Sequence, residues 1–160
     1  MMINVHPSPV ANSYVTEDEF KLFCELRDIS ITVDTSVLLT NAMDYLNALR
    51  WRGKKTDSDQ PLPFPRVGII HDNEAISSEN VPANIKLAQC WLAIYSQETE
   101  LMPINEQSHV VQETISVISV RYSDKGDGSA YAPSFPIVDK LLSDFINSDK
   151  YAISTRAIRC

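Results

Sequence analysis

Apolar residues recur at helical spacing in four separate stretches of the chain. The first stretch follows Thr16 and Glu19, whose spacing is typical of a capping box, and the third opens with Pro82 in a first-turn position. A helix with one apolar face is stable only when that face is buried against a neighbour, so the pattern predicts a mainly α fold, a helical bundle of about four helices. The expected helices cover about 17–28, 35–50, 82–95 and 137–145.

Residues 113–122 predict a small β element instead. They are rich in β-branched side chains and alternate between apolar and polar, with one slip near Ile118. This pattern predicts a β-strand with a bulge, paired with residues 107–111 as a hairpin. The polar, glycine-containing residues 123–134 then predict a loop.

A long proline-rich loop, residues 51–80, connects the second and third predicted helices. Prolines at 61, 63 and 65 fix the backbone φ angle and remove three donors, so residues 60–66, here called the proline strap, should be extended and rigid. Aromatic and cationic side chains, which dominate interface energetics, flank this strap. The pattern predicts an assembly surface formed by Trp51, Arg52, Lys54, Pro61, Phe64, Pro65 and Arg66.

Two structural roles stay open as alternatives for this loop. Trp51 could anchor the strap against the helical core rather than against a partner. Arg66 could bind backbone carbonyls that the prolines leave exposed, which is as good an explanation as a partner contact.

The two ends of the chain predict extended termini around a single domain. Residues 1–12 contain two prolines and few apolar side chains, which predicts an N-terminal arm that orders only against a partner. Residues 13–146 have the length of one helical domain.

Residues 147–160 predict a C-terminal tail that is too sparse in apolar residues to build a core. Its cations include Lys150, and no acidic residue follows Asp149. We expect the tail to become ordered by docking, with Tyr151, Arg156 and Arg159 in the contact.

The net charge of −7 argues against attraction of nucleic acid to the molecule as a whole. The charge is uneven, however, because residues 50–55 hold four cations, whereas residues 72–113 carry seven acids against Lys86 alone. Opposite patches suit head-to-tail self-association, and chance clustering on a solvated surface explains them equally well.

Aromatic rings near the cations of 50–55 allow a second hypothesis, in which Tyr45, Trp51 and Phe64 stack on the bases of single strands. We favour packing or interface roles for these rings. With one short basic island, no useful affinity for single-stranded DNA is expected near physiological salt.

No set of residues in the sequence predicts catalysis. The three histidines, His6, His71 and His109, lie far apart in no metal-binding spacing, and the loops that cradle phosphate are absent. Three dispersed cysteines predict reduced thiols. No apolar run approaches the roughly 20 residues that span a membrane. We therefore expect a protein that is not an enzyme, holds no cofactor or metal and does not enter a membrane.

Five short motifs occur in an order that resembles a known family. They are Ser13-Tyr14-Val15, Ala42-x-x-Tyr45-Leu46, Trp51-x-Gly53-Lys54, Gln60-Pro61-Leu62-x-x-Pro65-Arg66, and Val81-Pro82 at the start of a helix. This order resembles the phage proteins labelled "DnaT-like", over roughly residues 12–145. Those proteins are encoded among tailed-phage head genes and look like head-to-tail adaptors with a helical core.

The resemblance implies a structural virion protein, a head-completion connector at the neck of a tailed bacteriophage. Such a protein would form a homo-oligomeric ring of about twelve copies. Its partners would be the portal protein and the tail, tail-terminator or nozzle proteins, and genomic DNA would pass through the lumen without sequence-specific binding. It would reside in the host cytoplasm during assembly. The family label also implies the alternative, a single-stranded DNA-binding replication accessory protein, which salt-dependent binding to single strands would distinguish.

Overall fold

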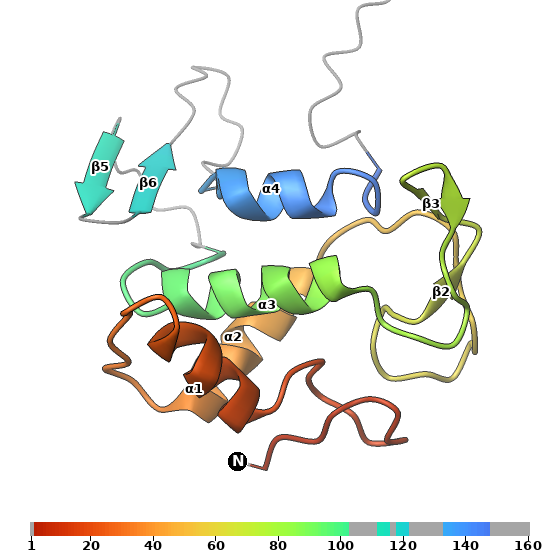
Figure 1. Ribbon diagram of the computed structural model, residues 1–160, viewed down its shortest axis with the longest axis horizontal. Coiled ribbons are helices and arrows are strands. Elements are labelled where there is room, and N and C mark those ends of the chain that lie inside the picture. The colour runs from red at the N-terminus through yellow and green to blue at the C-terminus, as the bar shows by residue number, and fades with distance from the viewer. Residues whose placement is uncertain (1, 103–111, 116–117, 122–132, 148–160) are drawn as a thin grey trace, which may run out of the picture.

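The fold is built on four helices, with α3 at the centre. The computed structural model describes residues 2–102, 112–115, 118–121 and 133–147. Figure 1 shows α3 between α4 on one side and α1 and α2 on the other, and α3 contacts both α2 and α4. The mainly α fold class with small β elements is therefore confirmed. The helices are α1 (Glu17–Glu25), α2 (Thr35–Asn47), α3 (Ala83–Tyr95) and α4 (Pro136–Leu142).

Local capping signals set the starts of α1 and α2. The Thr16 hydroxyl accepts the Glu19 N–H at 3.1 Å, and the Glu19 carboxylate accepts the Thr16 N–H at 2.8 Å, which is the predicted capping box. Asp34 accepts the N–H of Ser36 at 2.8 Å and begins α2.

Helices α1 and α2 end earlier than predicted. Asp28 has a φ of 54°, a left-handed conformation that a helix cannot continue through, and α1 stops at Glu25. Helix α2 stops at Asn47, so Arg50 lies outside it instead of closing its last turn. The backbone carbonyl of Arg50 accepts the N–H of Asn147 at 2.9 Å, a contact with the opposite end of the chain that no local pattern announces.

The core collects the apolar faces of all four helices. Buried polar groups within it are few and paired, as burial requires. The largest fully buried side chains are Tyr14, Phe20, Leu38, Leu39, Leu46, Phe64, Ile69, Ile85, Leu92, Phe135, Leu142 and Phe145.

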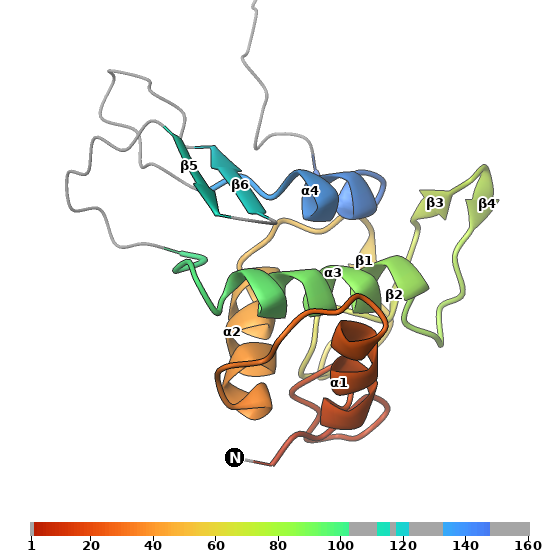
Figure 2. The same ribbon diagram turned by 60° about the vertical axis from the view of Figure 1, so that its left-hand side comes forward.

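Three short antiparallel strand pairs complete the described part. They are β1 (Lys54–Lys55) with β2 (Arg66–Val67), β3 (Ile70–His71) with β4 (Glu74–Ala75), and β5 (Gln112–Ile115) with β6 (Ile118–Arg121). Figure 2 shows the second pair beyond one end of α3 and the first pair beside that end. The prediction of one bulged strand over 113–122 is wrong. Ile118 pairs with Ile115, so the slip in the alternation marks the start of a second strand. The expected partner, 107–111, lies outside the described residues, as does most of the loop 123–134.

Residues 2–12, expected to be an arm ordered by a partner, bind within the chain. The Asn4 N–H donates to the Asn12 side chain and the Asn12 N–H donates to the Asn4 carbonyl, both at 2.8 Å. Val5 bridges to Ser13, and Ala11 is buried. These residues are called the N-terminal loop below. Among the described helices, none has the length and apolar character that a membrane crossing needs.

Candidate functional site

The prediction of an extended proline strap is wrong. Its backbone bends at residues 61–63 and again at Pro65, and most of its side chains face the core. Phe64 is 1% exposed, and its ring meets those of Trp51 and Phe145 edge-on, with centroids 4.9 and 6.0 Å apart. The Trp51 indole N–H donates to the carbonyl of Leu46 at 2.9 Å. Trp51 therefore anchors the strap to the core, the first of the structural alternatives. Pro65 is also buried, whereas Pro61 is exposed.

Arg66 plays the structural role that was its alternative. Its guanidinium donates to three backbone carbonyls: Nε to Arg52 at 2.7 Å, Nη2 to Gly53 at 2.9 Å and Nη1 to Pro63 at 3.2 Å. Partial burial lowers the pKa of Arg66 from its ordinary value, but an arginine stays charged in proteins. One side chain thus ties the strap to the residues that precede β1.

Two side chains that the sequence reading did not single out also hold the strap. The Gln60 amide donates to the carbonyls of Leu62 and Pro65 at 2.8 and 2.9 Å. The buried Tyr14 hydroxyl accepts the Phe64 N–H at 3.0 Å, and burial raises the Tyr14 pKa above its ordinary range. Both residues belong to the motifs Ser13-Tyr14-Val15 and Gln60-Pro61-Leu62. The sequence did contain one signal for this role. Gln60 is a polar residue next to a run of prolines, and carbonyls in such a run need donors from side chains.

The four cations of residues 50–55, Arg50, Arg52, Lys54 and Lys55, are all exposed. We call this stretch the basic segment. It contains no acidic residue, and within the described part of the chain none of its cations forms an ion pair. Unpaired exposed cations are available to an anionic partner.

The backbone of the basic segment is fixed from both sides. Arg52 N–H donates to the Phe145 carbonyl at 2.9 Å, and Trp51 forms an antiparallel bridge with Ile146. Lys54 pairs with Val67 across β1 and β2. The segment is therefore a preformed, positively charged edge and not a free loop, which reduces the entropy lost on binding.

His71 is half-buried and contacts groups from the far end of the described chain. Its Nδ1 lies 2.8 Å from a carboxylate oxygen of Asp144, and its ring lies 5.0 Å from that of Phe145. Its Nε2 is 3.5 Å from Asp72. The described residues contain no group of three or more His, Cys, Asp or Glu side chains placed to hold a metal ion.

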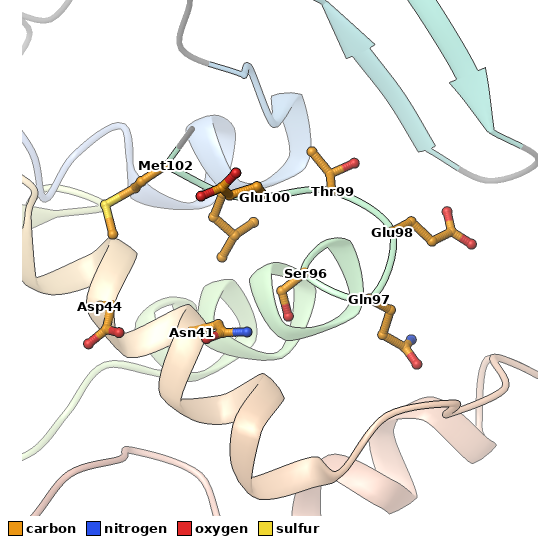
Figure 3. A pocket seen from close by; sticks show the side chains of 9 residues that line it. Asn41, Asp44, Ser96, Gln97, Glu98, Thr99, Glu100 and Met102 are labelled. Carbon is orange, nitrogen blue, oxygen red and sulfur yellow. The ribbon is translucent and has the colours of Figure 1, made fainter. Parts of the chain in front are cut away.

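A hollow of about 450 Å³ lies where the chain leaves α3. Figure 3 shows Asn41 and Asp44 on one side of it, from α2, and the turn from Ser96 to Met102 on the other. Asp44, Glu98 and Glu100 place carboxylates around it, and the C-terminal end of a helix adds negative partial charge. Phosphate would be repelled here, so this hollow is a poor site for nucleic acid.

The candidate residues therefore divide into three groups. Arg52, Lys54 and Pro61 are exposed, whereas Trp51, Phe64 and Pro65 are buried and Arg66 is partly buried. Tyr151, Arg156 and Arg159 lie outside the described residues. Tyr45 and the two buried rings cannot stack on bases, because their faces are covered by the core.

The comparisons with known proteins give one match. The model of a family described as "Putative DnaT-like ssDNA binding protein" matches residues 2–160. No curated protein matches the chain. No solved structure matches it either.

This match corrects the interpretation of the chain as a phage head-to-tail adaptor. The matched family is described by single-stranded DNA binding and not by a connector role. The predicted portal and tail partners, the ring of copies and the passage of DNA through a lumen without binding are therefore wrong. The family description favours the alternative, a single-stranded DNA-binding accessory protein. The connector role was inferred from the position of such proteins among phage head genes, and the family description does not include it. Because the match covers all but the first residue, the chain belongs to this DnaT-like family.

Proposed function

We propose that this protein is a single-stranded DNA-binding accessory protein that contacts the sugar-phosphate backbone through the basic segment. The observation that carries the proposal is the exposed, acid-free edge of Arg50, Arg52, Lys54 and Lys55 in a chain that otherwise has excess negative charge. The family description supports the same ligand. A local basic edge can bind phosphate although the net charge is −7, because screening limits the reach of distant charges to about 10 Å at 0.1 M salt.

The contacts supported by the structure are to phosphate and not to bases. Stacking on bases needs an exposed aromatic face. Among the described residues every aromatic side chain is buried or half-buried. Binding should therefore tolerate any base sequence and should depend steeply on salt. Four neutralised phosphates give a slope of log K against log salt of about −3 on single strands.

The test is fluorescence anisotropy with a labelled oligothymidine across a salt series. The double variant Arg50→Ala with Lys54→Ala removes two exposed cations whose side chains form no ion pair within the described part of the chain, so folding should be unaffected. We expect affinity to fall about tenfold at low salt and the slope to become shallower by about 1.4.

The matched control is Lys21→Ala with Lys86→Ala, which removes two exposed cations from α1 and α3 and the same net charge. It should change affinity far less. Equal losses in the two double variants would show that only net charge matters. Absence of binding by the unaltered protein at low salt would reject the function itself.

A further inference from the structure

An apolar groove of about 550 Å³ opens between the N-terminal loop and the proline strap. Each of these two walls contributes two prolines, whose flat rings offer apolar area at little entropic cost. Its apolar lining consists of Pro7, Pro9, Ala11, Pro61, Leu62, Phe64 and Pro65. In Figure 1 the N-terminal loop and the loop that leads to β2 approach each other at this place, below β2.

The polar lining of the groove is acidic. Asp57, Asp59 and Glu79 contribute carboxylates, and no lysine or arginine is among the described residues that line it. His6 also borders it, and burial followed by the nearby charge of Lys86 lowers the His6 pKa, which favours the neutral ring. The groove therefore suits an apolar segment with positive charge, and it repels the phosphates of DNA.

The groove is preformed because hydrogen bonds fix both of its walls. Gln60 and Arg66 hold the carbonyls of the strap, and Asn4 and Asn12 close the N-terminal loop through mutual bonds. A preformed site loses little entropy on its own side when it is filled.

The chain itself contains a segment of the matching chemistry. Residues 148–160 carry three cations against Asp149 and no later acid. Three apolar side chains lie between the cations. The residues concerned are Lys150, Tyr151, Ile153, Arg156, Ile158 and Arg159.

The segment is joined to the groove wall through the core, although Figure 1 shows α4 and the N-terminal loop on opposite sides of α3. The described chain ends at Asn147, whose N–H is bonded to Arg50, and the nearby Phe145 ring lies 6.0 Å from the ring of Phe64 in the groove wall. The thirteen residues that follow can extend over about 43 Å. Attachment to the same chain raises the local concentration of the segment at the groove, which favours the chain's own segment over that of a second copy.

We propose that residues 148–160 dock in this groove of their own chain. Their apolar side chains cover the proline walls, and their cations pair with Asp57, Asp59 and Glu79. The docking is separate from DNA binding by the basic segment, so either can fail without the other.

A nitroxide on Cys160 of the full-length protein tests the docking by NMR. Cys24 and Cys90 are 1% and 4% exposed, so the reagent should react at the terminal cysteine. Docking predicts strong broadening of the amide signals of Thr56, Asp59 and Ser78, relative to a Cys160→Ser sample treated in the same way. Unbroadened groove signals would overturn the proposal.

Charge reversal then tests the chemistry. Asp59→Lys with Glu79→Lys should abolish the broadening, whereas Glu25→Lys with Glu74→Lys, which changes the same charge at exposed positions outside the groove, should leave it intact. Equal effects of the two pairs would reject the acidic lining as the recognition element.

A mixed sample distinguishes the chain's own segment from that of another copy. An isotope-labelled Cys160→Ser chain is combined with an unlabelled chain that carries the nitroxide. We expect no broadening in this mixture. Broadening of the groove signals here would assign the occupant to a second copy and overturn the proposal as stated.

Discussion

Gly53 shows at the scale of one residue why the Trp51-x-Gly53-Lys54 motif contains glycine. Its φ is 68°, and a Cβ on this residue would lie 2.2 Å from the backbone oxygen of Val67. The close approach is required by the pairing of β1 with β2. Any side chain at this position would have to displace backbone, and not only a flexible side chain.

Gly53→Ala should therefore lower the free energy of unfolding by more than about 2 kcal/mol, the upper cost of a left-handed alanine alone. Gly68→Ala is the matched control. Gly68 also has a positive φ, 83°, but a Cβ on this residue would lie 3.8 Å from the nearest atom, which is an ordinary contact. Gly68→Ala should therefore lower the free energy of unfolding by only about 1 kcal/mol. Urea unfolding measures the free energy of unfolding of both variants. Equal losses in the two would contradict the prediction, because they would mean that the backbone at Val67 moves aside easily.

Arg66→Lys tests the contacts of the guanidinium, because a single ammonium cannot reach the three separate carbonyls that Arg66 binds. We expect a loss of about 1–3 kcal/mol in unfolding free energy, the cost of leaving partly buried acceptors without donors. Arg50→Lys, at an exposed position, should be nearly neutral. An unchanged midpoint for Arg66→Lys would show that water replaces the lost bonds.

At the scale of the elements, the helices were predictable because their signals are local. The capping box, the Asp34 cap and the apolar periodicity all lie within one element. The strand pairs β1 with β2 and β3 with β4 were not predicted, since each strand has two residues and depends on its partner for stability. The β3–β4 turn places Asp72 and Asn73 at positive φ, without the glycine that usually signals such a turn.

The candidate site was only partly predictable for a related reason. Three prolines fix φ and remove donors, but they do not say where the chain bends or which side of it faces the core. The outcome depended on Tyr14 and Trp51, which are distant in sequence from the strap and reach it only in the fold. The cations of the basic segment, by contrast, were visible as an unbroken local run.

Tyr14→Phe tests how firmly the strap is held. It leaves the buried N–H of Phe64 without its acceptor at 3.0 Å, which should cost about 1–3 kcal/mol in unfolding free energy. Tyr95→Phe removes a hydroxyl from another buried tyrosine but keeps its ring stacked on Phe135 at 4.9 Å, so it should cost less. Hydrogen exchange of the Phe64 amide gives a direct second measure, and it should accelerate only in the first variant.

For the whole molecule, the burial of cysteine thiols and tyrosine hydroxyls predicts sensitivity to alkali. Burial raises the pKa of Cys90 to about 12 and raises that of Tyr14 as well. The unfolded chain releases these protons from pH about 9 upward, while the folded chain retains them. Above that pH the folded state binds more protons than the unfolded chain. The stability that these groups contribute is therefore complete below pH 9. The free energy of unfolding then falls as the pH rises, by up to about 1.4 kcal/mol per pH unit for each group.

Unfolding by urea at pH 8, 9 and 10 measures this decline. Cys90→Ala should make the decline shallower between pH 9 and 10, because the thiols begin to titrate in the unfolded chain before the tyrosines do, and Cys24 still contributes. A decline of the same slope in Cys90→Ala would assign it to other groups.

Gln89 has a consequence for the order in which the protein can be made. Its fully buried amide on α3 accepts the Tyr14 N–H at 3.0 Å and donates to the Ser13 hydroxyl at 2.8 Å. Tyr14 in turn holds the strap through Phe64. During synthesis Gln89 appears 75 residues after Tyr14, so Tyr14 and the N-terminal loop lack these bonds to the core until α3 has left the ribosome. Nascent chains arrested before residue 83 should therefore be cut readily by protease within residues 2–80, and the same bonds should resist once α3 is complete.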